Sequence, residues 1–134
     1  MFSFIIPYLL SVPILVAFDL LWLGVVMKDF YRSQIGHLLS PSIGWGAAVV
    51  FYLIFTAGLF YFAVAPAAAK QSLTAALMAG ALFGFFAYAT YDLTNMATLL
   101  RWPLAVTVVD ILWGTVLGGV LASAGYVLFT FFNK

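Results

Sequence analysis

The chain has 134 residues, of which 66% are hydrophobic and only 7% are charged, and its formal net charge is +1. Soluble domains carry about 25% charged residues, so the composition excludes a water-soluble fold of this length. The weak net charge, the lack of cysteine and the single histidine, His37, exclude a nucleic-acid-binding surface, thiol catalysis and a multi-histidine metal site, and we predict no nucleic-acid partner, no metal and no cofactor.

Charged residues divide the chain into four apolar segments. Residues 1–27 contain only Asp19, residues 38–69 contain no charge, and residues 71–100 and 102–133 contain only Asp92 and Asp110. About 20 apolar residues cross the hydrocarbon core of a bilayer, so each segment is long enough for one helix and too short for two. We predict an all-α, four-helix transmembrane bundle, a single domain over residues 1–134 with helices at about 4–27, 42–65, 71–99 and 102–131.

Three short connections join the predicted helices. Residues 28–37 are the only long polar stretch and predict a short interfacial segment whose apolar face carries Phe30, Ile35, Leu38 and Leu39. Ser40-Pro41 has the residue types of an N-cap and a first helical position, so it is expected to begin the second helix. Turns are expected at residues 66–71 and 100–103.

The basic residues give a weak indication of orientation. Lys28, Arg32 and Arg101 fall on one side of the membrane, here called side X, whereas Lys70 and Lys134 fall on the other. The ratio of three to two favours a cytoplasmic side X with both termini outside. Such a small difference is also what a homodimer of oppositely oriented copies would show, so both arrangements stay open.

Three aspartates lie inside the predicted helices and at one depth. Asp19, Asp92 and Asp110 are each nine residues from Lys28 or Arg101, which corresponds to about 13 Å at a rise of 1.5 Å per residue. A charged residue in the bilayer costs roughly 2.5–3.5 kcal/mol on insertion scales, so such residues suggest a function. The structural alternative is that they hold helices together through hydrogen bonds.

Two stripes of small and polar residues indicate which faces of the helices meet. The third predicted helix carries, at spacings of three or four residues, Ala76, Gly80, Gly84, Tyr88, Asp92 and Asn95, with Tyr91 beside them. The fourth carries Thr107, Asp110, Gly114 and Gly118. Small residues let helix backbones approach closely, and polar residues turn toward protein. We expect the stripes to pack together, with Asp19 joining from the first helix.

No lysine or arginine lies inside the predicted helices to neutralise these acids. Burial and like charges disfavour ionised carboxylates, so either some aspartates are protonated near neutral pH or a cation or cationic ligand lies among them. Tyrosine, tryptophan and asparagine side chains could donate hydrogen bonds to an anion that remains. The predicted ligand- or proton-binding cluster is Asp19, Asp92, Asp110, Tyr88, Tyr91, Asn95, Trp22 and Trp113; the pattern identifies no catalytic residue.

Two of the aspartates belong to a repeated four-residue word. Asp19-Leu20-Leu21-Trp22 in the first predicted helix is similar to Asp110-Ile111-Leu112-Trp113 in the fourth, and these helices run in opposite directions. Repeats of inverted topology often flank binding sites in the middle of transporters. Four positions are few, so chance is a serious alternative to duplication.

Several of these words together resemble a known family. The relevant stretches are residues 19–24, 30–31, 61–64, 80–84, 88–95 and 110–114, and Tyr91-Asp92-Leu93-Thr94-Asn95 is the most specific. They resemble the small bacterial membrane proteins grouped as domain-of-unknown-function family 2177, over essentially the whole chain. The resemblance implies a multi-pass protein of the bacterial inner (cytoplasmic) membrane with about four helices, and no established activity.

Three functions are compatible with this sequence. The favoured hypothesis is binding or proton-coupled transport of a small hydrophobic or lipid-like molecule at the buried cluster, by a protein whose other partner is the lipid bilayer. A membrane-embedded enzyme or accessory subunit in lipid or isoprenoid modification is the second, although the chain has no Asp-rich diphosphate motif and no histidine cluster. A structural subunit of a larger membrane complex is the third.

Overall fold

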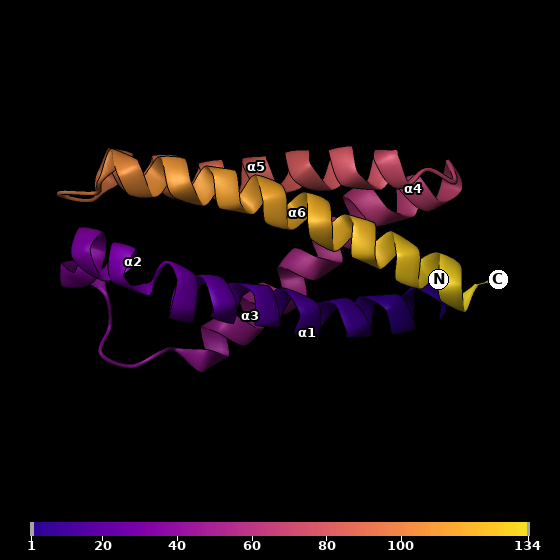
Figure 1. The fold of residues 1–134 in the computed structure, drawn as a ribbon, viewed down its shortest axis with the longest axis horizontal. Coiled ribbons are helices and arrows are strands. Elements are labelled where there is room, and N and C mark those ends of the chain that lie inside the picture. Colours follow the sequence, from indigo (N-terminus) through magenta and orange to yellow (C-terminus); the bar gives the residue numbers. More distant parts are fainter. Residues whose placement is uncertain (1, 134) are drawn as a thin grey trace.

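The structure, a computed structural model, describes residues 2–133 and is almost entirely helical. Four helical segments of the described chain are long and apolar enough to span a membrane. In chain order they are α1 (Ile5–Leu21) continued by the π-helical turn η2 (Trp22–Val26); α3 (Trp45–Leu59) continued by the π-helical turn η4 (Phe60–Val64) and by α4 (Ala65–Ala69); α5 (Leu73–Thr98); and α6 (Leu104–Phe132). The prediction of an all-α, four-helix membrane fold is confirmed (Figure 1).

The second span differs from its expected bounds at both ends. It begins at Trp45, so the expectation that Ser40-Pro41 begins the helix was wrong. The backbone N–H of Ser42 instead donates to the Ser40 hydroxyl over 3.3 Å, a local turn that competes with a helical start. At the other end the helix continues through Pro66 to Ala69, and Pro66 comes just after the π-helical turn η4, where the regular α-helical hydrogen-bond pattern is already interrupted.

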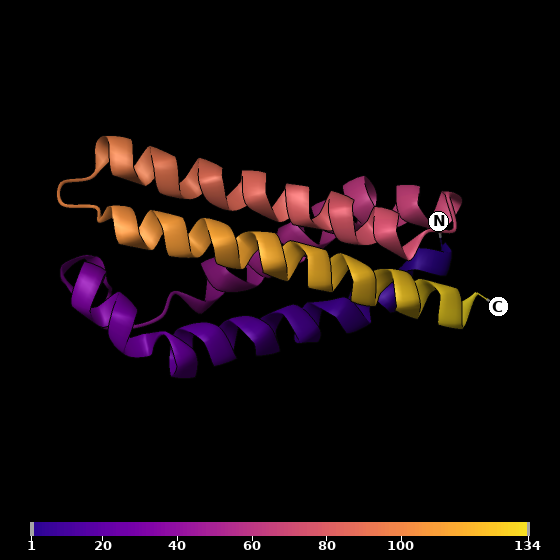
Figure 2. The same cartoon turned by 45° about the horizontal axis from the view of Figure 1, so that its top comes forward.

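Helices α5 and α6 form a tight antiparallel hairpin (Figure 2). The predicted contact between their small-residue stripes is present. A Cβ atom added to Gly80 would overlap the carbonyl oxygen of Gly118, and one added to Gly84 would overlap that of Gly114. Backbone therefore packs directly on backbone along this contact, which we call the glycine seam (Gly80, Gly84, Gly114 and Gly118).

The other two spans meet the hairpin in the half of the molecule away from side X. Leu15 of α1, Leu59 of α3 and Leu117 of α6 are almost completely buried there and form one apolar core. Helix α1 contacts both α3 and α6, and it stays helical through Pro13. Toward side X, α3 runs obliquely to the hairpin (Figure 1), so this half is packed less tightly.

Between the first two spans lie the helix α2 (Lys28–Ile35) and the short turn η3 (Gly36–Leu38). The expected helical face was only partly right, because α2 ends at Ile35 and leaves Leu38 in the turn η3 and Leu39 in extended chain. Tyr31 and Ile35, one turn apart, are buried against Val106 near the start of α6. Helix α2 thus bridges from the end of the first span to the beginning of the fourth.

Candidate functional site

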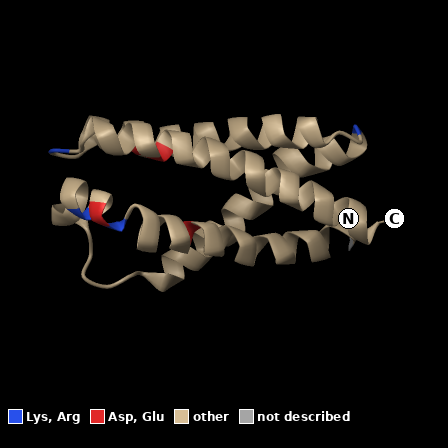
Figure 3. Cartoon of the chain, in the orientation of Figure 1, with Lys and Arg blue, Asp and Glu red and all other residues tan. Residues whose placement is uncertain are grey.

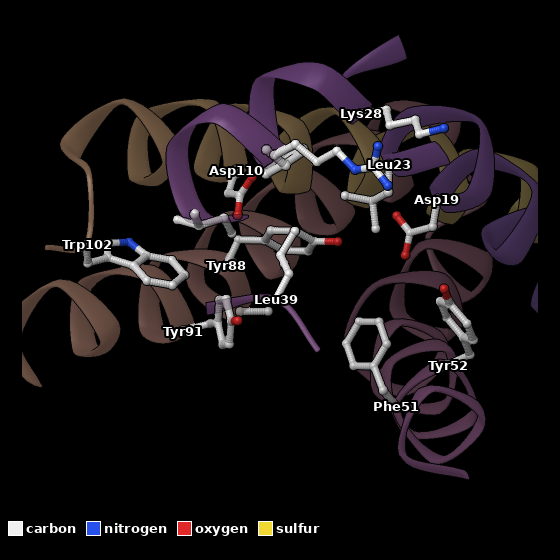
Figure 4. A pocket seen from close by; sticks show the side chains of 14 residues that line it. Asp19, Leu23, Lys28, Leu39, Phe51, Tyr52, Tyr88, Tyr91, Trp102 and Asp110 are labelled. Atoms are coloured by element: carbon white, nitrogen blue, oxygen red, sulfur yellow. Dashed lines mark hydrogen bonds between the residues drawn. The ribbon is translucent and has the colours of Figure 1, made fainter. Parts of the chain in front are cut away.

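A cavity of about 740 Å³ lies in the half of the molecule nearest side X. Side chains from α1, η2, α2, α3, α5 and α6 line it, most of them apolar or aromatic. Figure 4 shows Asp19 and Asp110 facing this space from different sides, with the ring of Tyr88 between them. The charged and phenolic groups of the lining are Asp19, Asp110, Lys28, Arg32, Tyr31, Tyr52, Tyr88 and Tyr91.

The Asp110 side of the cavity is organised by α2. The Tyr31 hydroxyl donates a hydrogen bond to Oδ1 of Asp110, and the indole Nε1 of Trp22 donates to the Tyr31 oxygen over 3.1 Å. Burial, followed by the bond to Asp110, raises the pKa of Tyr31 above its ordinary value. Tyr31 therefore remains a protonated donor that ties α2 to the fourth span.

The Asp19 side is organised by the repeated word. The indole Nε1 of Trp113 donates to Oδ1 of Asp19 over 3.3 Å. The rings of Trp22 and Trp113 are stacked, with centroids 4.2 Å apart and planes 1° from parallel. The tryptophan of each repeated segment thus supports the aspartate of the other. Trp113 donates a hydrogen bond to Asp19 directly, whereas Trp22 donates to Tyr31, which in turn donates to Asp110. Antiparallel helices carrying the same word bring about this reciprocal arrangement.

Asp92 differs from the other two acids because it does not line the cavity. It is completely buried beside Asp110, on the contact between α5 and α6, and neither carboxylate oxygen has a hydrogen-bond partner among residues 2–133. An ionised carboxylate without partners is very costly in such a place, so a carboxyl group there is stable when it is neutral. Asp92 is suited to store a proton next to the cavity.

Only some of the other predicted site residues line the cavity. Tyr88 and Tyr91 line the cavity, whereas Trp22, Trp113 and Asn95 do not. The hydroxyl of Tyr88 points toward Asp19 (Figure 4), but Tyr91 is 58% exposed and packs edge-on against Trp102. Of the donors expected to bind an aspartate directly, Trp113 does so, and Trp22 donates to Tyr31 instead.

Sequence reasoning missed the contribution of α2. Lys28, Tyr31 and Arg32 line the cavity, although the polar stretch containing them was interpreted as an interfacial connection. The signal was a spacing: Lys28 and Arg32 are four residues apart, as are Tyr31 and Ile35, so they share one side of a helix. Which surface that side would meet was not readable from the spacing.

Figure 3 shows the charges in this half of the molecule, with the basic residues of α2 farther toward its end than the acidic residues of α1 and α6. Lys28 and Arg32 thus bring positive charge to the outer part of a cavity whose inner part carries Asp19 and Asp110. Within residues 2–133, no three histidine, cysteine, aspartate or glutamate side chains are grouped so that they could hold a metal ion.

Four apolar spans around a mostly apolar cavity that holds a few charged side chains define a small polytopic membrane protein. The chain belongs to the family described as "Predicted membrane protein (DUF2177)", whose model matches residues 4–127 and confirms the resemblance seen in the sequence. Comparison with curated proteins and with solved structures gives no significant match. The family description supplies a membrane location and no activity.

Proposed function

We propose that this protein binds a small hydrophobic or lipid-like molecule in the cavity and that binding is coupled to protonation of the carboxyl groups there. The observation that carries the proposal is the cavity itself. Its volume of about 740 Å³ falls within the roughly 300–1,000 Å³ of small-molecule sites. A mostly apolar wall with a few convergent polar groups is also typical of such sites.

The coupling follows from the solvation of Asp19 and Asp110. Water in the empty cavity stabilises an ionised carboxylate, and an apolar ligand removes that water. Binding therefore favours the neutral carboxyl form and takes up a proton. By linkage, an uncharged apolar ligand binds more tightly as the pH falls. In a transporter, the same linkage would couple ligand movement to proton movement.

The hydrogen-bonded groups around the cavity support a role in proton handling. Tyr31 and Trp113 each donate to one cavity carboxylate, and Asp92 lies beside Asp110 without a partner of its own among the described residues. A proton held on Asp92 stays close to Asp110 and to the ligand, because Asp92 lies just outside the cavity lining. The bacterial inner membrane, which the family resemblance implies, is the location we propose.

Binding of a fluorescent apolar probe tests the proposal. We expect 1-N-phenylnaphthylamine to bind the purified protein in detergent micelles, and to bind more tightly at pH 5.5 than at pH 8. Ala87→Trp fills the cavity and should abolish binding, whereas Ala105→Trp, at an exposed position outside the lining, should not. Probe binding that Ala87→Trp leaves unchanged in a folded protein would refute a ligand site here.

The proton coupling has its own control. The double variant Asp19→Asn, Asp110→Asn should retain probe binding and lose its pH dependence, since neither amide titrates. Asp29→Asn, an exposed position on α2 that does not line the cavity, should behave as the natural sequence does. An unchanged pH dependence in the double variant would remove these two aspartates from the coupling.

A further inference from the structure

The cavity has two cationic side chains that the binding of an uncharged hydrophobic molecule does not use. Lys28 and Arg32 lie one turn apart on α2, are exposed, and both contribute to the lining. They are at the end of the molecule nearest side X, outward from the acidic residues of α1 and α6 (Figure 3). This is the level at which the headgroups of a bilayer would lie.

We propose that the bound molecule is a membrane lipid with a phosphate headgroup, and that its phosphate binds Lys28 and Arg32. This inference rests on the proposed function. A guanidinium group presents paired N–H donors that match phosphate oxygens, and a nearby ammonium adds a compact positive charge. Basic side chains at the membrane surface are attracted to anionic headgroups in general. The cavity adds a wall of apolar side chains beside those charges.

The distribution of charge fixes the orientation of such a lipid. Asp19 and Asp110 stand deeper in the cavity and already accept hydrogen bonds from Trp113 and Tyr31. Ionised, they would repel a phosphate; neutral, they leave only the basic residues of α2 to attract it. The phosphate therefore stays at the outer end, and the first carbons of the tail enter the apolar part.

The apolar lining favours a lipid over soluble phosphate. Leu23, Leu39 and Phe51 line the cavity and are also 49%, 48% and 41% exposed, so the cavity is continuous with the lipid-facing surface. An acyl chain can leave the cavity past these side chains and remain in the bilayer. Inorganic phosphate would gain nothing from them, because apolar surface contributes to binding only when another apolar group covers it.

Displacement of the fluorescent probe by simple amphiphiles tests this inference. Dodecyl phosphate, dodecanol and dodecyltrimethylammonium share one tail and differ in head charge. We expect dodecyl phosphate to displace the probe at the lowest concentration and inorganic phosphate not to displace it at all. The double variant Lys28→Gln, Arg32→Gln should weaken the binding of dodecyl phosphate by at least about tenfold and leave the binding of dodecanol unchanged.

Three variants serve as controls. Lys28→Arg and Arg32→Lys keep the charge and should retain most of the affinity for dodecyl phosphate. Lys70→Gln removes a positive charge from the turn at the opposite end of the molecule and should have no effect. Unchanged dodecanol binding shows that the double variant is folded. If the double variant does not fold, the single variant Arg32→Gln is used for the same test.

Several results would overturn the inference while leaving the proposed function intact. Equal affinity for dodecyl phosphate and dodecanol would show that the head is not recognised, and preference for dodecyltrimethylammonium would assign recognition to Asp19 and Asp110. Displacement by millimolar inorganic phosphate would indicate a soluble ligand. If no amphiphile displaces the probe and Ala87→Trp has no effect on it, the proposed function itself fails.

Discussion

Helices α5 and α6 contribute both to the glycine seam and to the cavity, but they pack in opposite ways at the two places. Along the seam, Gly80 and Gly84 of α5 touch the backbone of α6 with no room for a Cβ atom. Toward side X, α5 contributes Tyr88 and Tyr91 and α6 contributes Asp110, all of which line a cavity of about 740 Å³. Small side chains let the two backbones touch at the seam, whereas the larger and charged side chains toward side X leave space for the cavity.

The difference separates a rigid helix contact from the proposed binding site in a small membrane protein. The seam holds α5 and α6 in a fixed register, which keeps the polar end of each stripe at the same depth. The cavity region can then contain unpaired or solvated polar groups, because the packing along the seam offsets the free energy that these groups cost the folded state. The seam should therefore respond to added volume, and the cavity to changes in charge and hydrogen bonding.

The largest expected effect is from Gly84→Ala. Its methyl group would overlap the carbonyl oxygen of Gly114, so the helices must separate, and overpacking of this kind costs about 1–3 kcal/mol or more. Thermal unfolding in detergent measures the loss. The matched control is Gly24→Ala, where an added Cβ atom would meet no other described atom within 4 Å beyond its own stretch of helix, so stability should be unchanged or slightly raised. Equal loss in both variants would contradict direct backbone packing at the seam.

The second prediction concerns Asp92→Leu. Because neither Asp92 oxygen has a partner among the described residues, an apolar side chain of similar size should raise the free energy of unfolding by about 1–3 kcal/mol. Asp19→Leu should instead lower it, since the indole N–H of Trp113 loses its acceptor. Thermal unfolding of the two variants gives the signs. A loss of stability in Asp92→Leu as large as that in Asp19→Leu would show that Asp92 is held by a partner.

The third prediction is a local effect of Tyr31→Phe. The variant loses the hydrogen bond to Asp110 and the acceptor for Trp22, so attachment of α2 should weaken by about 1–2 kcal/mol. Because the pKa of Tyr31 is raised, its hydroxyl in the natural protein stays protonated below about pH 10, and this contribution is lost only above that pH.

Amide hydrogen exchange measures the attachment of α2 directly. Exchange should become faster within residues 28–35 and stay unchanged along the glycine seam. Tyr61→Phe, at a position that is 73% exposed, is the control and should alter neither region. Exchange in α2 that does not respond to Tyr31→Phe would mean that the contact of Ile35 with Val106 alone holds this helix.

The smallest effect is expected at the turn between the second and third spans. Gln71 has a φ of 50°, a conformation that costs an L residue with a Cβ atom roughly 1–2 kcal/mol. Gln71→Gly removes that cost but increases the freedom of the unfolded chain, so a gain below about 1 kcal/mol is expected. Gln34→Gly, within α2, should lower stability instead. Thermal unfolding with the two signs reversed would contradict this backbone assignment.

The sequence by itself determined the four spans and the faces on which α5 and α6 meet. Both depend on regular spacing: apolar runs of membrane length, and small residues every three or four positions along a helix. These signals are local and survive without knowledge of the rest of the fold. The sequence also shows the repeated four-residue segment. Its structural role depends on the stacking of Trp22 on Trp113, which only the structure shows.

Only the tertiary structure decided which side chains share the cavity. Tyr31 reaches Asp110 across 79 positions of sequence because the backbone around Met27 turns α2 back against α6, and no periodicity encodes that turn. The same turn moves Lys28 and Arg32 from an apparent surface connection to the cavity lining. Helix spacing predicts which residues share a face, but contacts between segments far apart in the chain decide what that face meets.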